Sequence, residues 1–190
     1  MNNSTNFRTL SSQLDKTLWL KIAVIVVFAA ITALTARITI PLPFTPVPVT
    51  LQTLAVVLSG LVLGARGGAW AQLAYLGLIA AGLPLDARAV GPAAFFGPTA
   101  GYLIGFVPAA FVAGWLAERF SAKSWWGNFL AGIAGMLVIY LVGAGWLGAM
   151  LGSVEKAWLG GVAPFILIDL GKAIIAASVA ESGKFFFLRK

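Results

Sequence analysis

The segment "APFILIDLGKAIIAASVA", residues 163–180, is apolar almost throughout, yet it carries an aspartate and a lysine, Asp169 and Lys172. A helix needs roughly 17–25 apolar residues to cross a bilayer core about 30 Å thick. The segment has that length and composition, so it predicts a transmembrane helix. Its two charges then need an explanation, because an ionised side chain at the centre of such a helix costs roughly 2.5–3.5 kcal/mol on insertion scales.

The composition of the whole chain is typical of a membrane protein. Of the 190 residues, 60% are hydrophobic and 10% are charged, whereas soluble domains average roughly 45–50% and 25%. The length allows one domain, since domains usually have about 100–200 residues. Cysteine and histidine are absent, which excludes disulfides, Cys/His metal sites and imidazole catalysis. We therefore expect no cofactor and no metal.

Six apolar runs account for most of the chain. They cover residues 18–36, 49–64, 68–83, 99–116, 126–148 and 161–180. The second and third are short and are separated only by "GARGG" (64–68), which predicts a tight helical hairpin or, alternatively, one kinked and partly buried segment. We expect an all-α integral membrane protein with six transmembrane helices. A leader would occupy residues 1–17, the membrane domain 18–184, and a basic tail 185–190.

The positive charges predict the orientation in the membrane. Six crossings place both termini on one side, which would hold nine of the 13 Lys and Arg residues, against three on the other side. Cytoplasmic loops carry an excess of Lys and Arg, so both termini are predicted to be cytoplasmic. These cations are spread along an apolar chain rather than gathered on a polar face. We therefore expect the lipid bilayer, and no nucleic acid, as a partner.

Two long loops on the other side predict a covered pocket that opens outward. The first, "RITIPLPFTPVPVT" (37–50), contains four prolines and should be a stiff, extended strap. The second, "LPLDARAVGPAAFFGPTAGY" (83–102), is rich in Gly and Pro. Non-helical backbone at membrane depth must be buried in protein or line a cavity. Two ordinary exposed loops are the alternative interpretation.

Asp169 and Lys172 are three residues apart and so share one face of a helix. One interpretation is an ion pair that faces the bundle and serves packing alone. The other is that both groups face the pocket, where a carboxylate only accepts hydrogen bonds and an ammonium only donates them. Such a pair suits a ligand with N–H groups beside a carbonyl or carboxylate. Gln52 and Tyr102 are the expected polar companions, although each could instead be a packing residue with its own partner.

Three segments together resemble the BioY family, the biotin-specific substrate-binding (S) components of energy-coupling factor (ECF) transporters. They are "PLPFTPVPVTLQTLAVVLSGLVLGARGG" (41–68), "FFGPTAGYLIGF" (95–106) and "DLGKA" (169–173). The resemblance implies a bacterial cell-membrane protein that captures biotin from outside. It also implies a membrane T (coupling) subunit and two cytoplasmic ATPase subunits as partners. The chain has no G-x-x-x-x-G-K-[ST] phosphate loop, so it is not itself a P-loop ATPase.

The resemblance also implies roles for single residues. Asp169 would accept hydrogen bonds from the ureido N–H groups of biotin. Lys172 would donate to the ureido carbonyl or keep Asp169 ionised, while Arg88 would bind the tail carboxylate; the reverse assignment of the two cations is also open. Ala29 and Ala33 correspond to the Ala-x-x-x-Ala face that S components present to the T subunit. Apolar walls for biotin are expected from Phe44, Val47, Phe95, Phe96 and Tyr102.

Other functions make different predictions. A self-contained secondary transporter or channel would use Asp169 and Lys172 for ion coupling, and such folds often carry internal repeats, which we do not find here. Transport by the purified chain without ATPase partners would identify it. An intramembrane enzyme would need more than one buried carboxylate, so the chain is predicted not to be an enzyme. A pure scaffold would bind no small molecule.

Overall fold

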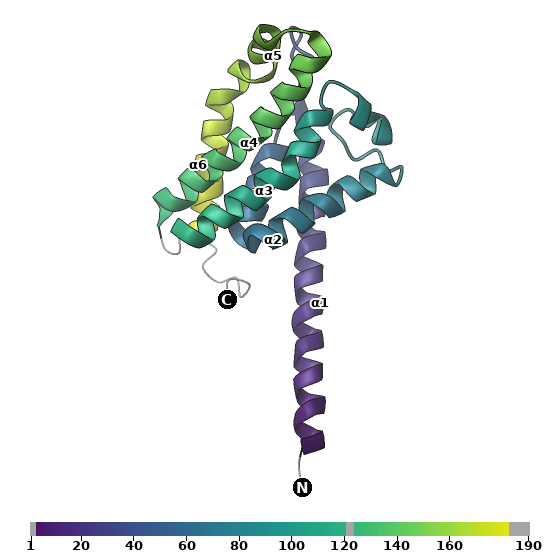
Figure 1. Cartoon of the computed structure of the whole chain (residues 1–190), viewed down its shortest axis with the longest axis vertical. Coiled ribbons are helices and arrows are strands. Elements are labelled where there is room, and N and C mark those ends of the chain that lie inside the picture. The colour runs from purple at the N-terminus through teal and green to yellow at the C-terminus, as the bar shows by residue number, and fades with distance from the viewer. Residues whose placement is uncertain (1–2, 121–123, 183–190) are drawn as a thin grey trace.

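The computed structural model describes residues 3–120 and 124–182, and these are nearly all helical. Figure 1 shows the long helices packed as a bundle, with the first part of α1 extending beyond it. The long helices are α1 (Asn3–Ala36), α2 (Gln52–Ala80), α3 (Ala100–Phe120), α4 (Trp125–Leu151) and α6 (Ile166–Ser182). The short elements are β1 (Thr39–Ile40), β2 (Val49–Thr50), α5 (Val154–Gly161) and the 3₁₀ turns η1 (Gly91–Phe96) and η2 (Ala163–Phe165).

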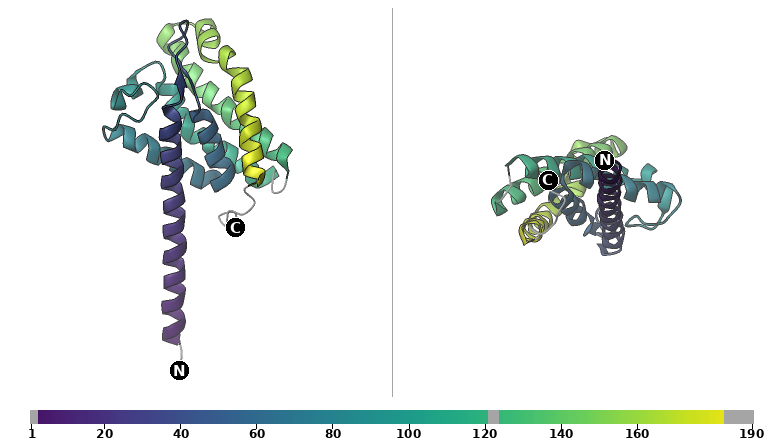
Figure 2. Two further views of the ribbon diagram at one scale, coloured as in Figure 1. Left: turned by 180° about the vertical axis from the view of Figure 1, so that it is seen from behind. Right: turned by 90° about the horizontal axis from the view of Figure 1, so that it is seen from below.

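The two ends of the bundle differ. The start of α1 and the end of α6 lie toward the same end, as both side views show (Figures 1 and 2), and we call this the terminal end. The strands β1 and β2 and the short helix α5 lie at the opposite end, which we call the loop end. An even number of crossings predicts this arrangement. The predicted basic tail, 185–190, lies outside the described residues.

Helix α2 contains both of the short predicted crossings. It is interrupted at Gly64, whose φ of 76° is in the left-handed region that favours glycine. Its two arms, 52–63 and 65–80, fold back on each other. A hydrogen bond joins the arms, in which Gln52 Nε2 donates to Tyr75 Oη at 2.7 Å. In a straight helix these residues would be about 35 Å apart. The predicted hairpin is therefore present, but it turns at the single residue Gly64 rather than over the whole "GARGG" segment. The described chain has five helical segments long and apolar enough to cross a membrane, and α2 is one of them.

Glycines allow α2 and α3 to approach closely. A Cβ added at Gly60 would lie 2.2 Å from the Ala110 carbonyl oxygen, and one at Gly114 would lie 2.4 Å from the Ala65 nitrogen. Small residues at such interfaces let helix backbones touch in lipid. Beside the turn, Glu118 Oε1 accepts a hydrogen bond from Ala65 N at 2.9 Å. This contact satisfies a backbone donor at the start of the second arm.

Two segments differ from the prediction. The proline-rich segment is not one extended strap, because β1 and β2 pair antiparallel with Thr39 opposite Thr50. Its prolines lie between the strands, where their lack of an N–H costs no ladder hydrogen bond. We keep the name strap for residues 37–51. Helix α5 was not predicted; it starts at Val154 and is capped by Ser153, whose Oγ accepts from Lys156 N at 3.2 Å. Helix α6 consequently begins at Ile166 rather than at residue 161.

The predicted partner-docking pair is buried inside the chain. Ala29 and Ala33 are 2% and 8% exposed and belong to the hydrophobic core. Close by, Gln72 Nε2 of α2 donates to Thr32 Oγ1 of α1 at 3.3 Å and to Ser59 Oγ at 3.0 Å. In this arrangement the two alanines pack α1 against its own bundle. Docking of a T subunit on them stays a prediction, and it would require α1 to separate from α2.

The close approach of α2 and α3 predicts unequal effects of alanine at two glycines of α2. Gly60→Ala should destabilise the protein by roughly 1–3 kcal/mol, because the new methyl group meets backbone. Gly77→Ala is the matched control, since nothing lies within 4 Å of its Cβ position. Thermal unfolding in detergent should show a lower transition temperature for Gly60→Ala alone. Equal stability of the two variants would contradict this account of the packing.

Candidate functional site

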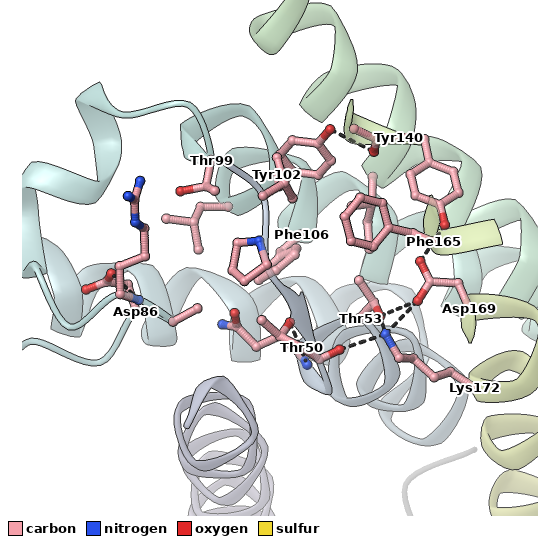
Figure 3. A pocket seen from close by; sticks show the side chains of 18 residues that line it. Thr50, Thr53, Asp86, Thr99, Tyr102, Phe106, Tyr140, Phe165, Asp169 and Lys172 are labelled. Atoms are coloured by element: carbon pink, nitrogen blue, oxygen red, sulfur yellow. Dashed lines mark hydrogen bonds and ion pairs between the residues drawn. The ribbon is translucent and has the colours of Figure 1, made fainter. Parts of the chain in front are cut away.

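A cavity lies at the loop end, between the strap, the loop that follows α2, and helices α2, α3, α4 and α6 (Figure 3). Its polar lining includes Asp169 and Lys172, and its apolar lining includes Phe106 and Phe165. The cavity volume is about 60 Å³, whereas pockets for small ligands usually measure about 300–1,000 Å³. The covering residues therefore have to move apart before a ligand of that size can enter.

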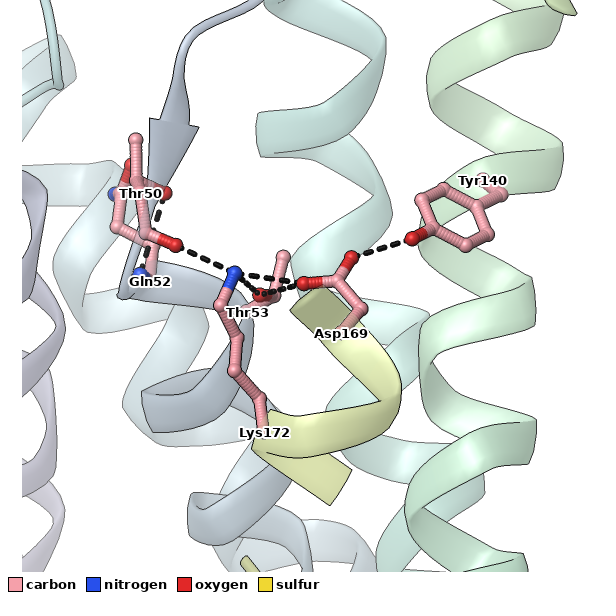
Figure 4. A network of polar contacts seen from close by, with 6 residues as sticks. All are labelled: Thr50, Gln52, Thr53, Tyr140, Asp169 and Lys172. Carbon is pink, nitrogen blue, oxygen red and sulfur yellow. Dashed lines mark hydrogen bonds and ion pairs between the residues drawn. The ribbon is translucent and has the colours of Figure 1, made fainter. Parts of the chain in front are cut away.

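Lys172 donates three hydrogen bonds at the wall of this cavity (Figure 4). Its Nζ lies 2.6 Å from Asp169 Oδ1, 2.7 Å from the Thr50 carbonyl oxygen and 2.9 Å from Thr53 Oγ1. An ammonium group has three protons to donate, so all three are used. The side chain is 6% exposed, and these contacts offset the cost of burying its charge.

Asp169 is held from several sides. Its Oδ1 accepts from Lys172 and, at 3.0 Å, from Thr53 Oγ1, while Tyr140 Oη donates to Oδ2. Asp169 lies in the first turn of α6, where the partial positive charge of a helix N-terminus favours a carboxylate. The two interpretations of the pair therefore combine: Asp169 and Lys172 form an intrahelical ion pair, and both line the cavity.

Four further residues predicted for the site also line the cavity: Gln52, Tyr102, Val47 and Arg88. Tyr102 Oη donates to the Gly161 carbonyl at 2.9 Å, and Gln52 Nε2 donates to Tyr75 at 2.7 Å. Both polar companions therefore already have protein partners. Gly161 gives Tyr102 its space, since a Cβ there would lie 2.2 Å from the tyrosine oxygen.

Three predicted aromatic wall residues lie elsewhere. Phe44 and Phe96 are 66% and 81% exposed, and neither lines the cavity. Phe95 is partly buried and packs against the core. The aromatic walls that the structure does provide come from the helices: Tyr102 and Phe106 of α3, Tyr140 of α4, and Phe165 before α6.

Three polar residues that we did not predict for the site are part of it: Thr53, Tyr140 and Asp86. Asp86 is 3% exposed, and its carboxylate accepts from Gly91 N at 2.7 Å and from Arg88 N at 3.0 Å. It thus fixes the loop that carries Arg88. Tyr140 had a usable signal, because it is an isolated hydroxyl in an apolar run. Thr53 had none, since its partners are more than 110 residues away in the sequence.

The family comparison covers nearly the whole chain. The model of the BioY family matches residues 5–187. The chain belongs to the BioY family. It is 41% identical over 155 residues to "Biotin transporter BioY" of Thermotoga maritima, with 81% of this chain and 89% of that protein covered. It is 43% identical over 163 residues to "Biotin transporter BioY" of Rhizobium etli, with 81% and 87% covered.

The fold is also that of a solved structure. The crystal structure of the S-component for biotin from an ECF-type ABC transporter superposes with a TM-score of 0.79 and 24% sequence identity, and 98% of this chain and 95% of that chain are covered. At this identity the likeness shows the fold. Together with the long apolar helices, membership of the BioY family makes the chain a multi-pass protein of the cell membrane.

The buried ion pair predicts strongly coupled effects on stability. Lys172→Met should lower the free energy of unfolding by roughly 3–5 kcal/mol, because it leaves a buried carboxylate without its counter-charge. The double variant Asp169→Asn, Lys172→Met should recover most of that loss, since no net charge stays buried. Unfolding in detergent, followed by circular dichroism, measures the free energy of unfolding of each single variant and of the double variant. A loss in the double variant equal to the sum of the single losses would show that the two side chains act independently.

Proposed function

We propose that this chain captures biotin from outside the cell as the S component of an ECF-type transporter. The observation that carries the proposal is the buried ion pair of Asp169 and Lys172 in the wall of a covered cavity. Membership of the BioY family, with relatives named as biotin transporters, supports biotin as the ligand. A capture protein needs no catalytic group, and the proposal includes none.

The unused acceptor on Asp169 supports ureido recognition. A carboxylate has about four acceptor positions, and Lys172, Thr53 and Tyr140 fill three of them. The remaining position, on Oδ2, is available to a ureido N–H of biotin. All three protons of Lys172 are engaged, which favours its role in balancing the charge of Asp169 over direct donation to the ureido carbonyl.

The remainder of biotin needs an apolar wall and a cation. Val47, Phe106 and Phe165 supply apolar surface along the cavity, suited to the thiophane ring and the alkyl tail. Arg88 is exposed on the loop that covers the cavity. We assign it to the tail carboxylate, because guanidinium and carboxylate groups form strong paired hydrogen bonds.

Transport would depend on other subunits. We propose a membrane T subunit and two cytoplasmic ATPase subunits as partners, in line with the S-component fold. The predicted orientation, with both termini in the cytoplasm, places the cavity on the outer side and the terminal end next to the ATPases. A self-contained transporter is not favoured, because within the described residues the ion pair at the cavity joins Asp169 and Lys172, and all three protons of Lys172 are already donated.

Biotin titration of the purified protein in detergent tests the ligand and the role of the pair. The wild type should bind with a 1:1 stoichiometry by calorimetry. Asp169→Asn should weaken binding at least 100-fold, and Tyr140→Phe about tenfold, as expected for lost hydrogen bonds to charged groups. Lys156→Gln, at an exposed site on α5, is the control and should bind like the wild type. A folded, monodisperse wild type that ignores biotin would refute the proposal.

A ligand without the tail charge tests the role of Arg88. Arg88→Gln should weaken biotin binding roughly 10- to 100-fold, in the range of a hydrogen bond between charged groups. The same variant should bind biotin methyl ester as tightly as the wild type does, because the ester carries no carboxylate. If the substitution weakens both ligands equally, Arg88 shapes the loop and does not contact the tail.

A further inference from the structure

A second hollow lies at the terminal end, away from the biotin cavity. It is a groove of about 230 Å³ between α1 and the turn of α2. Two cations border it, Lys21 of α1 and Arg66 of α2. The rest of the lining is apolar and consists of Ile25, Leu63, Gly67 and Trp70. One groove therefore combines two positive charges with an apolar wall.

The two cations have no acidic partner in the described part of the chain. The ion pair found there joins Asp169 and Lys172, and no carboxylate lines the groove. Glu118, which packs against the turn of α2, directs its Oε1 to the backbone nitrogen of Ala65. Lys21 and Arg66 are exposed. The groove thus presents two exposed cations that form no ion pair within the described residues.

The groove lies at the level of the membrane interface. Lys21 is near the start of the apolar stretch of α1, Thr17–Ala36, and Arg66 follows the turn of α2 directly. Three exposed tryptophans lie at a similar level: Trp19 near the start of that apolar stretch, Trp70 in the second arm of α2, and Trp126 in the first turn of α4. Tryptophan is enriched where the hydrocarbon core meets the lipid headgroups. The cations are therefore expected at headgroup depth, and Ile25 lies one helical turn further into the apolar stretch than Lys21.

We propose that this groove binds one anionic phospholipid, with its phosphate between Lys21 and Arg66. An acyl chain would lie against Ile25, Leu63 and Trp70. Basic pockets between transmembrane helices on the cytoplasmic side suit acidic headgroups, and arginine matches the geometry of a phosphate. The apolar lining selects a lipid over free phosphate. A lipid seated here contacts both α1 and the turn of α2, and so braces the contact that buries Ala29 and Ala33.

Native mass spectrometry of the detergent-purified full chain, titrated with phosphatidylglycerol, tests the proposal. Arg66→Gln should retain the first bound lipid roughly fivefold less tightly than the wild type. The double variant, Lys21→Gln with Arg66→Gln, should retain it about 25-fold less tightly, because each cation contributes about the same attraction to the headgroup. Trp70→Ala should also weaken retention, with no change of charge. Arg119→Gln is the matched control, because it removes one exposed cation at the same end but outside the groove.

Four results would overturn the proposal. The double variant could retain the lipid like the wild type. Arg119→Gln could weaken retention as much as Arg66→Gln does, which would mean that the lipid is held by general surface charge and not by the groove. Glycerophosphate could displace the lipid at equal concentration, which would mean a free phosphate site. Lipid retention could stay intact while the double variant loses a co-expressed coupling subunit, which would mean a protein-docking surface. Circular dichroism and biotin titration check that each variant is folded.

Discussion

The contacts of Lys172 hold together three parts of the molecule that are distant in the sequence. Its ammonium group joins Asp169 on α6, Thr53 on α2 and the Thr50 carbonyl of β2 in the strap. In a low-dielectric interior, a buried charge is tolerated only when its partners are close and complete. The geometry of α6, of the first arm of α2 and of the strap is therefore tied to one set of hydrogen bonds, and the cavity forms where the three meet.

The rest of the bundle supplies the backbone geometry that this set of contacts requires. Gly64 reverses α2 at one residue, so the strap and the second arm of α2 both reach the loop end. Gly60 and Gly114 bring α2 and α3 into backbone contact. This contact places Tyr102 and Phe106 of α3 in the wall of the cavity. Asp86 fixes the covering loop. Close packing by small residues and the polar site are thus two parts of one arrangement.

The sequence predicted the helices and the charged pair because both signals are local. Apolar runs set the crossings, and two charges in an apolar run are visible without a structure. The prediction was incomplete wherever it depended on which neighbours a side chain contacts in the folded protein. Phe44 and Phe96 have the right chemistry for a wall but are exposed and do not line the cavity. The spacing of Ala29 and Ala33 indicates close helix contact, but it does not say whether the neighbour is α2 or another protein. Tyr140 and Thr53 join the site only through tertiary contacts.

The small size of the cavity has a kinetic consequence. A ligand can enter only while the cover is open, so the association rate is the encounter rate multiplied by the open fraction. A cavity of about 60 Å³ has to widen before a ligand of ordinary size enters or leaves, and this requirement slows both steps. Such a site can hold its ligand for a long residence time, at the cost of a slower response to a rise in the supply of that ligand.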